Sequence, residues 1–131
     1  YAVERGEEAL RLTEENRRKF LADNVRVVGG DAPAALEKLP APDRVFIGGS
    51  GGDLREIIEA VLEKNGDAKI VLTAVTLETL SETVRIAERL GLSCETSLIS
   101  AARSRNAGRS TLILGENPVY IFTLRRMSDD E

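Results

Sequence analysis

Apolar and polar residues follow one another along the chain in blocks that predict strands followed by helices. Short apolar runs are typical of strands, and apolar residues recurring every three or four positions are typical of helices. The predicted order is a strand and a helix, repeated four times, and then two further strands. The strands are expected at 1–3, 25–28, 44–47, 68–74, 93–102 and 118–124, and the helices at 7–22, 32–39, 54–64 and 76–90.

The same pattern predicts which faces are buried. The strand at 68–74 is apolar without alternation, as expected of a central strand that helices cover on both faces. Thr76 is expected to cap the last helix, and Cys94 and Tyr120 are expected to be packing residues on the last two strands. The predicted inward positions are Ala9, Leu10, Thr13, Phe20 and Leu21 in the first helix, Leu54, Ile57, Ile58, Val61 and Leu62 in the third, and Leu80, Val84 and Ala87 in the fourth.

This alternation of strands and helices predicts a doubly wound α/β fold with a mostly parallel sheet. The last two strands have no helix between them, so they must pair antiparallel or leave the sheet. We therefore expect an antiparallel edge at the C-terminal end of the fold.

The composition of the chain excludes several kinds of functional site. The chain has 131 residues, enough for one domain, and no apolar run approaches the roughly 18 residues of a membrane span. Its net charge of -4 disfavours an extended nucleic-acid face. It has no histidine and one cysteine, which excludes histidine-based triads, histidine-ligated metals and an internal disulfide. A single cysteine suits a reducing cytoplasm.

A glycine-rich turn follows the strand at 44–47. Gly48, Gly49, Gly51 and Gly52 surround Ser50, and Asp53 with Glu56 has the spacing of a capping box for the next helix. Glycine lets backbone N–H groups approach a ligand closely, and a helix N-terminus favours anions. The turn therefore predicts a ligand site at the carboxyl end of a strand, although a tight connection between strand and helix is the alternative.

Two acidic residues stand at other strand ends. Glu4 ends the first strand, where a carboxylate can accept hydrogen bonds from ribose hydroxyls. Asp31, followed by Ala32, ends the second strand, where it could accept a hydrogen bond from an adenine amino group. The alternatives are a solvent-facing carboxylate for Glu4 and a helix N-cap for Asp31. The order of the two acids and the glycine turn along the chain is a more specific indication of a ligand site than any one of these features alone.

Five runs of the chain carry a family resemblance: Tyr1-Ala2-Val3-Glu4, Gly30-Asp31-Ala32-Pro33, Asp43 to Gly52, Ala74-Val75-Thr76-Leu77-Glu78 and Asn117-Pro118-Val119-Tyr120-Ile121. These runs closely resemble the decarboxylating precorrin methyltransferases of cobalamin biosynthesis. The run Phe46 to Gly52 is the most specific, and the likeness covers nearly the whole chain. An antiparallel strand near the end of the sheet is also typical of methyltransferases that use S-adenosylmethionine.

The resemblance implies a Rossmann-like class I methyltransferase fold with S-adenosylmethionine as cofactor. Glu4 would hold the cofactor ribose, Asp31 and Ala32 the adenine, and Gly48 the boundary between cofactor and substrate. The reaction would methylate carbon 15 of a precorrin and release carbon dioxide from an acetate side chain. No histidine, metal or nucleophilic side chain is required, and no catalytic residue is predicted.

The precorrin substrate carries many carboxylates, so its site should offer cations and N–H donors. Gly49, Ser50 and Gly51 are predicted to contact it. Arg103, Arg105 and Arg109 lie in a predicted loop after the long strand, where guanidinium–carboxylate pairs could form. The alternative is a solvated charged loop. The resemblance also implies a homo-oligomer, a tetramer in relatives, with no nucleic-acid or membrane partner.

The domain is expected at residues 1–127, with an acidic tail at 128–131. The first strand and the cofactor's own Gly-rich loop are expected to be missing, because Tyr1 to Val3 corresponds to the second strand of the family. This should leave two unpaired sheet edges, so we expect the chain by itself to bind S-adenosylmethionine poorly. Two other hypotheses stay open: a class I methyltransferase for another acceptor, and a nucleotide-binding module without catalysis.

Overall fold

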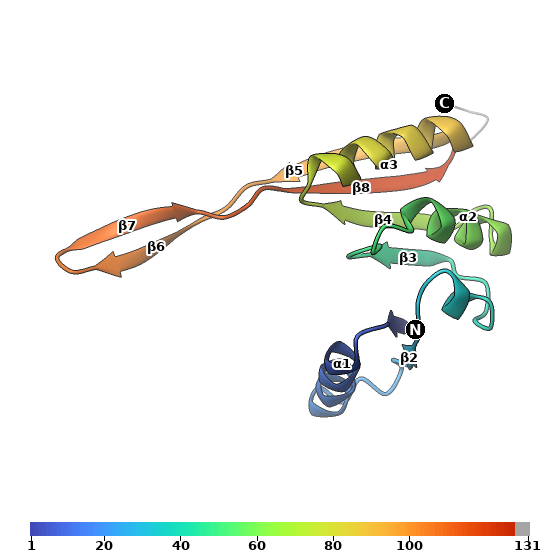
Figure 1. Cartoon of the computed structure of the whole chain (residues 1–131), viewed down its shortest axis with the longest axis horizontal. Helices are drawn as coiled ribbons and strands as arrows, with labels where there is room; N and C mark the ends of the chain where they lie inside the picture. The colour runs from blue at the N-terminus through green and yellow to red at the C-terminus, as the bar shows by residue number, and fades with distance from the viewer. Residues whose placement is uncertain (128–131) are drawn as a thin grey trace. The chain divides into compact units, whose positions relative to one another are not determined.

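A computed structural model describes residues 1–127, and the chain forms two compact units (Figure 1). The first unit contains 1–41 and 50–64, and the second contains 42–49 and the chain from Asn65 onward. The predicted acidic tail at 128–131 lies outside the described residues. The boundary between the two units falls inside the glycine-rich turn, between Gly49 and Ser50.

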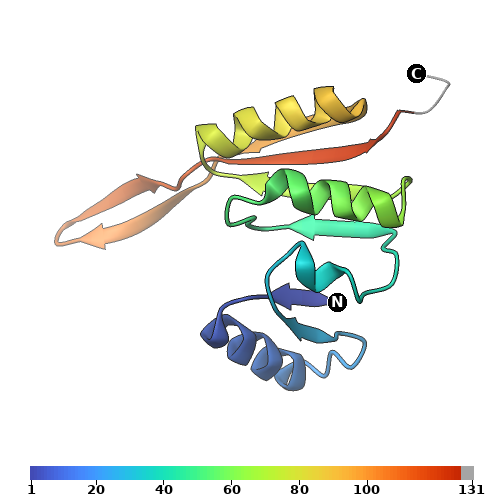
Figure 2. The same cartoon turned by 45° about the vertical axis from the view of Figure 1, so that its right-hand side comes forward.

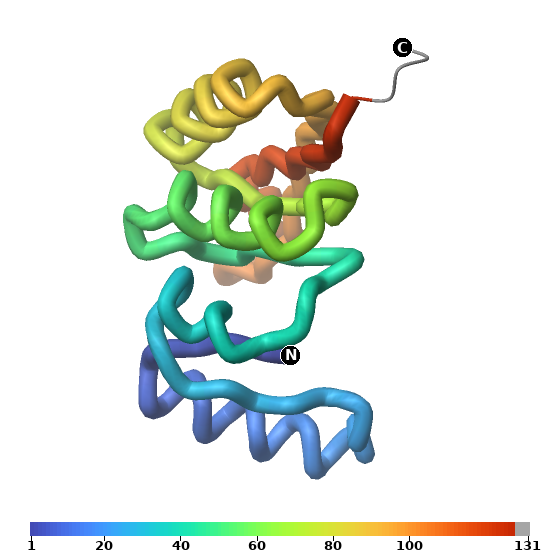
Figure 3. The backbone as a smooth tube through the Cα atoms, turned by 90° about the vertical axis from the view of Figure 1, so that its right-hand side faces the viewer, coloured from blue at the N-terminus to red at the C-terminus, as the bar shows by residue number. Residues whose placement is uncertain are grey.

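The first unit is built on two short parallel strands. These are β1 (Ala2–Glu4) and β2 (Val27–Gly29), which pair with Ala2 opposite Val27 and Glu4 opposite Gly29. Helix α1 (Glu7–Lys19) connects them and lies alongside the pair (Figure 3). The unit also contains the short 3₁₀ helix η1 (Ala34–Leu36) and helix α2 (Leu54–Lys64).

The second unit is built on a four-stranded sheet with the order β3-β4-β8-β5. Strand β3 (Arg44–Ile47) is parallel to β4 (Lys69–Ala74), whereas β8 (Val119–Arg126) is antiparallel to both of its neighbours, β4 and β5 (Leu92–Ile99). Helix α3 (Leu77–Leu90) contacts β4, β5 and β8 and runs along them (Figure 2). The expected antiparallel C-terminal strand is confirmed, and it lies inside the sheet.

Among the described residues, β1 pairs only with β2, and β3 pairs only with β4. Each of these strands therefore has one edge without a strand partner. The expectation that a first strand is missing from the sheet stays a prediction.

The fully buried residues are concentrated in α2 and in the second unit. The apolar stripe predicted for α2 is confirmed, because Leu54, Ile57, Ile58 and Val61 are buried and Leu62 is half-buried. No residue of 1–41 is fully buried. The buried apolar residues of the second unit are Ile47, Ala68, Ile70, Leu72, Ala74, Ile86, Ala87, Phe122 and Leu124.

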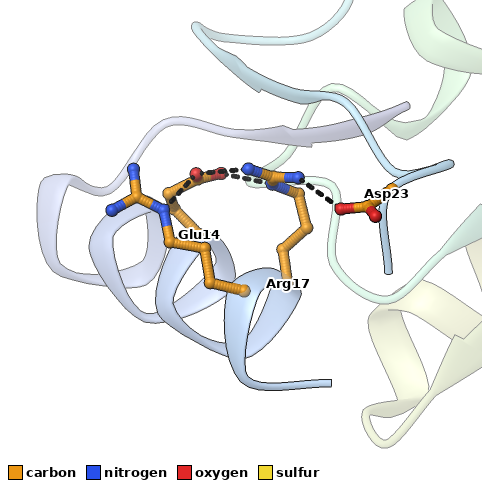
Figure 4. A network of polar contacts seen from close by, with 4 residues as sticks. Glu14, Arg17 and Asp23 are labelled. Carbon is orange, nitrogen blue, oxygen red and sulfur yellow. Dashed lines mark hydrogen bonds and ion pairs between the residues drawn. The ribbon is translucent and has the colours of Figure 1, made fainter. Parts of the chain in front are cut away.

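Charged side chains cover α1. Glu14 accepts hydrogen bonds from Arg17 at 2.8 Å and from Arg18 at 2.9 Å, and Arg17 also lies 3.7 Å from Asp23 (Figure 4). The hydrogen bonds from Arg17 and then Arg18 lower the pKa of Glu14 to about 2. The described contacts of this helix are therefore largely polar.

Two helices differ from their predicted lengths. Helix α1 ends at Lys19 and not near residue 22, because Leu21 adopts a left-handed backbone conformation with φ of 52° that does not continue a helix. The helix predicted at 32–39 is only the three-residue η1. The carbonyls of Glu37 and Leu39 accept hydrogen bonds from Lys64 Nζ at 3.0 and 2.8 Å, and Pro40 follows directly.

The buried face of α3 also differs from the prediction. Thr83, Ile86 and Ala87 are buried, whereas Val84 is exposed. Burial of Thr83 is tolerated because its hydroxyl donates a hydrogen bond to the Thr79 carbonyl at 2.7 Å. The cap at Thr76 is confirmed, since its hydroxyl accepts a hydrogen bond from Thr79 N–H.

The burial of β4 and β5 departs from the pattern in two places. In β4 the buried residues alternate with half-buried ones, although its central place in the sheet is confirmed. Cys94 is exposed, so its predicted core role is wrong: it lies on β5, the edge strand of the sheet. Tyr120 stacks on Phe122 with ring centroids 6.5 Å apart, which confirms its packing role.

The segment predicted as a loop around Arg103 to Arg109 is a second hairpin. Strands β6 (Ala102–Ala107) and β7 (Ser110–Gly115) pair antiparallel, and the hairpin extends beyond the ends of β5 and β8 (Figure 1). All of its strand residues are exposed. The prediction of a loop is therefore wrong, because neither strand buries a face that would show in the sequence pattern.

Candidate functional site

Glu4 has a fixed side chain at the end of β1. Its Oε1 atom accepts hydrogen bonds from the backbone N–H groups of Arg5 and Gly6, both at 2.9 Å. Gly6 is the N-cap residue of α1, so these bonds hold the carboxylate at the start of that helix. The other oxygen, Oε2, has no hydrogen-bond partner within residues 1–127 and can accept from a ligand.

Asp31 lies beside the end of β1 as well. The Gly30 N–H donates a hydrogen bond to the Glu4 carbonyl at 3.1 Å, which joins the two strand ends. The Asp31 carboxylate forms an ion pair with Arg5 at 3.6 Å. The following 3₁₀ helix has no side-chain cap, so the alternative role of Asp31 as an N-cap is not observed. Ala32, next to it, is half-buried.

The second half of the glycine-rich turn is a tight turn closed by a backbone hydrogen bond. Asp53 N–H donates a hydrogen bond to the Ser50 carbonyl at 3.1 Å, and Gly51 and Gly52 between them have φ of 63° and 104°. Two central residues with positive φ are typical of a type I′ turn, which explains the need for glycine at both positions. Because the Asp53 N–H is used in this way, Glu56 does not accept from it, and the predicted capping box is wrong. Glu56 instead accepts from Arg55 at 2.9 Å.

The first half of the turn belongs to the second unit. Gly48 and Gly49 are exposed, and a Cβ at Gly49 would meet no other atom within 4 Å. At Gly48 a Cβ would lie 3.2 Å from the ring of Phe46. Backbone groups at Gly49 are therefore accessible within this unit.

Arg103 and Arg105 lie on β6 of the exposed hairpin. They are two residues apart, opposite Leu114 and Leu112, and so share one face of it. Arg103 forms an ion pair with Glu116 at 3.1 Å, whereas Arg105 and Arg109 have no ion pair among residues 1–127. The Arg103 pair borders an open hollow of about 460 Å³ at the base of the hairpin, which Ile99, Asn117 and Val119 also line.

The contacts within the first unit bring together Glu4, Asp31 and Gly51, and the residue that joins them is Arg5. Its guanidinium contacts Asp31 and also lies against the bare backbone of Gly51. Arg5 was not predicted as a site residue. The only signal in the sequence is its position directly after Glu4, at the end of a strand.

The described residues also limit other kinds of site. Across residues 1–127, no group of three or more histidine, cysteine, aspartate or glutamate side chains could hold a metal ion. No helix in the same part of the chain is long and apolar enough to cross a bilayer. The one cysteine, Cys94, is exposed, although partial desolvation raises the pKa of its thiol.

The fold is shared with methyltransferases of Rossmann-like architecture. A solved S-adenosylmethionine-dependent O-methyltransferase from Thermotoga maritima superposes with a TM-score of 0.70 at 18% identity, over 99% of this chain and 51% of that one. This places the chain in the Rossmann-like methyltransferase fold class, as predicted from the sequence.

The chain belongs to the precorrin methyltransferase domain family, whose model matches residues 1–126. A probable cobalt-precorrin-6B C(15)-methyltransferase (decarboxylating) from Pyrobaculum calidifontis is 46% identical over 94% of this chain and 64% of its own length. Its namesake from Methanothermobacter thermautotrophicus is 40% identical over 93% of this chain and 65% of its own length. The chain thus spans slightly under two thirds of these two relatives.

Solved structures of the same family are also similar. The precorrin-6Y C5,15-methyltransferase from Geobacter metallireducens superposes with a TM-score of 0.86 at 42% identity, covering 95% of this chain and 67% of that chain. A precorrin-8W decarboxylase from Methanobacterium thermoautotrophicum gives a TM-score of 0.85 at 37% identity, over 94% and 67% of the two chains. The family resemblance predicted from the five sequence runs is confirmed.

Proposed function

We propose that the protein carrying this chain transfers a methyl group from S-adenosylmethionine to carbon 15 of a precorrin and decarboxylates an acetate side chain, in cobalamin biosynthesis. The observation that carries the proposal is the 46% identity, over 94% of the chain, to a relative named for this decarboxylating C15 methylation. The relatives from Pyrobaculum calidifontis and Methanothermobacter thermautotrophicus, 46% and 40% identical, both carry this name, which favours this reaction over methylation of another acceptor.

Glu4 and Asp31 would hold the adenosine part of the cofactor. The free Oε2 atom of Glu4 fits a ribose hydroxyl donor, because Oε1 is already held by two backbone N–H groups. Asp31 and Ala32 would meet the adenine, and Gly48 would border the methyl-transfer region. These residues therefore fit the adenosine half of S-adenosylmethionine. When bound, the cofactor supplies an electrophilic methyl group from its sulfonium centre.

Methyl transfer to an electron-rich ring carbon is an in-line displacement. It depends on alignment of the two reactants and on exclusion of water, more than on an acid or a nucleophile from the protein. The chain's part is therefore to orient and to bind. The lack of any histidine is compatible with this role.

The substrate's carboxylates would meet donors from the turn and the hairpin. Gly49, Ser50 and Gly51 offer backbone N–H groups and one hydroxyl. Arg105 has no ion pair among the described residues, and Arg103 would have to exchange Glu116 for a substrate carboxylate. Guanidinium groups suit such carboxylates because they can form two parallel hydrogen bonds.

We also propose that the protein is a homo-oligomer, a tetramer as expected from the resemblance, and that it works in the cytoplasm. The β6–β7 hairpin supports self-association, because a two-stranded hairpin that buries no face is marginally stable alone. Ile113 on β7 is 80% exposed. The Ile113→Asp variant should dissociate the oligomer in light scattering, whereas Leu21→Asp, equally exposed on the first unit, should not.

The reaction itself is tested with the full-length protein. S-adenosylmethionine labelled in its methyl group should label a cobalt-precorrin-6B substrate, with one carbon dioxide released for each methyl transferred. Labelling of a non-tetrapyrrole substrate would instead support the other methyltransferase hypothesis. Nucleotide binding at the glycine turn, without methyl transfer, would support the non-catalytic module.

The expectation that the 131-residue chain by itself binds S-adenosylmethionine poorly stays a prediction. The unpaired edges of β1 and β3 support it. A calorimetric titration of this chain that gives micromolar affinity would show it to be wrong.

A further inference from the structure

Arg5 contacts three segments that meet at the end of β1. Its backbone N–H binds Glu4 Oε1 at 2.9 Å, and its Nη1 atom lies 3.6 Å from Asp31 Oδ1. A Cβ at Gly51 would lie 2.9, 3.0 and 3.1 Å from Arg5 Nη1, Nη2 and Cζ. The Arg5 side chain therefore links Asp31, two residues after β2, to the glycine-rich turn, while the Arg5 backbone N–H holds the Glu4 carboxylate at the start of α1.

The contact between Arg5 and the turn depends on arginine at position 5 and on glycine at position 51. Gly51 has no side chain and a φ of 63°, so the guanidinium can lie directly on its backbone. A guanidinium is planar and rigid, whereas the ammonium of lysine is a compact group on a flexible chain. Lysine at position 5 would keep the charge and lose the flat contact.

Global stability does not explain this arrangement. The side chains of Arg5 and Asp31 are 62% and 70% exposed, and ion pairs at such exposure contribute little to folding. Arg5 is, however, the only cation within 4 Å of the Asp31 carboxylate among residues 1–127. Its effect is therefore on the direction in which Asp31 and the turn are held.

We propose that Arg5 is a positioning residue for the cofactor. It orients the Asp31 carboxylate of the adenosine half of the site before binding, and it holds the 50–53 turn beside the ends of β1 and β2. The inference rests on the proposed function, because it concerns S-adenosylmethionine. Without Arg5, these groups become ordered only when the cofactor binds, which lowers affinity.

The first experiment measures cofactor affinity in the full-length protein. Arg5→Ala and Arg5→Lys should both raise the Kd for S-adenosylmethionine, by roughly three- to tenfold. The melting temperature without cofactor should fall by less than about 4 °C. In turnover, the KM for the cofactor should rise and kcat should change little, because Arg5 touches no reacting atom.

Arg11→Ala is the matched control. Arg11 lies on α1, is 59% exposed and forms ion pairs with Glu8 and Glu15, but it contacts neither Asp31 nor the glycine-rich turn. Its Kd for S-adenosylmethionine should equal that of the wild type. An unchanged Kd in Arg5→Ala, or full rescue by lysine, would overturn the proposal.

A double-mutant cycle tests the contact itself, without the cofactor. Gly51→Ala should cost less stability in the Arg5→Ala background than in the wild type, because the clash with the guanidinium is gone while the backbone strain is the same in both. Gly52→Ala is the control: its φ is 104°, but a Cβ there would meet nothing within 4 Å, so its cost should be equal in both backgrounds.

The outcomes separate this inference from the proposed function. If the wild-type protein does not bind S-adenosylmethionine, the proposed function fails, and the positioning role fails with it whatever the cycle shows. If the wild type binds and Arg5→Ala binds equally well, only the inference fails. Additive costs for Arg5→Ala and Gly51→Ala would also contradict it, because the two residues would then not be in contact.

Discussion

The segment 1–41 and the four-stranded sheet β3-β4-β8-β5 are held together in different ways. The segment pairs two strands of three residues and has no fully buried side chain. The sheet has strands of four to eight residues and buries Ile70, Leu72 and Phe122 almost completely. The carboxylates proposed to bind the cofactor, Glu4 and Asp31, both belong to the weakly packed segment.

This difference indicates that the sheet provides stability and that the segment 1–41 provides the proposed ligand-binding groups. Apolar burial in the sheet supplies most of the folding free energy, because that energy scales with the apolar area removed from water. The segment is held by backbone hydrogen bonds and by exposed or half-buried ion pairs, which contribute little each. Regions with few buried contacts open at lower free energy than the core, so ligand binding can order them.

The largest expected effect concerns stability. Leu72→Ala in β4 should lower the free energy of unfolding by about 2–5 kcal/mol, because it leaves a cavity where a side chain is only 1% exposed. Leu12→Ala in α1 is the matched substitution, at a side chain 43% exposed, and should cost less than about 1 kcal/mol. Urea unfolding of the full-length protein measures both. Equal losses of unfolding free energy in the two variants would contradict the difference in packing between the two regions.

The next effect concerns cofactor binding. Glu4→Gln replaces a charged acceptor by an amide and should weaken S-adenosylmethionine binding by about tenfold to a hundredfold, since hydrogen bonds to charged groups contribute about 1.5–3 kcal/mol. Calorimetric titration of the full-length protein measures the change. Glu7→Gln, on the first turn of α1, is the control and should bind normally. Normal binding by Glu4→Gln would mean that the ribose lies elsewhere.

The smallest effect is a dependence on pH within α1. Hydrogen bonds from Arg17 and Arg18 lower the pKa of Glu14 from 4.5 to about 2. A carboxylate with a depressed pKa contributes stability above its unfolded value and loses it as the pH falls through its folded value. The contribution should therefore be complete above about pH 4.5 and lost progressively as the pH falls toward 2.

Acid titration followed by circular dichroism tests this dependence. Glu14→Gln should show a smaller change in helix signal between about pH 4.5 and 2 than the wild type. A control is again Glu7→Gln, whose side chain forms no ion pair among residues 1–127. If Glu14→Gln and the wild type titrate identically, the network drawn in Figure 4 does not stabilise the helix in solution.

Elements whose ends carry local signals could be predicted from the sequence. Strand β3 is observed where it was expected, because Pro42 and Gly48 bound an apolar run. Helix α3 begins after a capping Thr76 and ends before Gly91. The sheet-level prediction of an antiparallel C-terminal strand also holds, since residues 91–127 contain no crossover helix after α3.

Features without a local signal were missed. The strand β6 alternates arginine, serine and asparagine and buries no face, so nothing in its pattern distinguishes it from a loop. The buried face of α3 includes Thr83, whose polarity is hidden by a bond to its own helix. The sequence could predict that Glu4 and Asp31 lie close together, because they lie at or just after the ends of adjacent parallel strands. It could not predict which residues Arg5 contacts, because these contacts depend on the conformation of its side chain.

Hydrogen exchange of the full-length protein, with and without S-adenosylmethionine, tests the central claim most directly. Without cofactor, amides of β1 and β2 should exchange faster than those of β4 and β8. With cofactor, exchange should slow at 2–6 and 29–32 and stay unchanged in β4 and β8. Equal exchange of the two regions without cofactor, or protection confined to the β6–β7 hairpin, would contradict the claim that the weakly packed segment binds the cofactor.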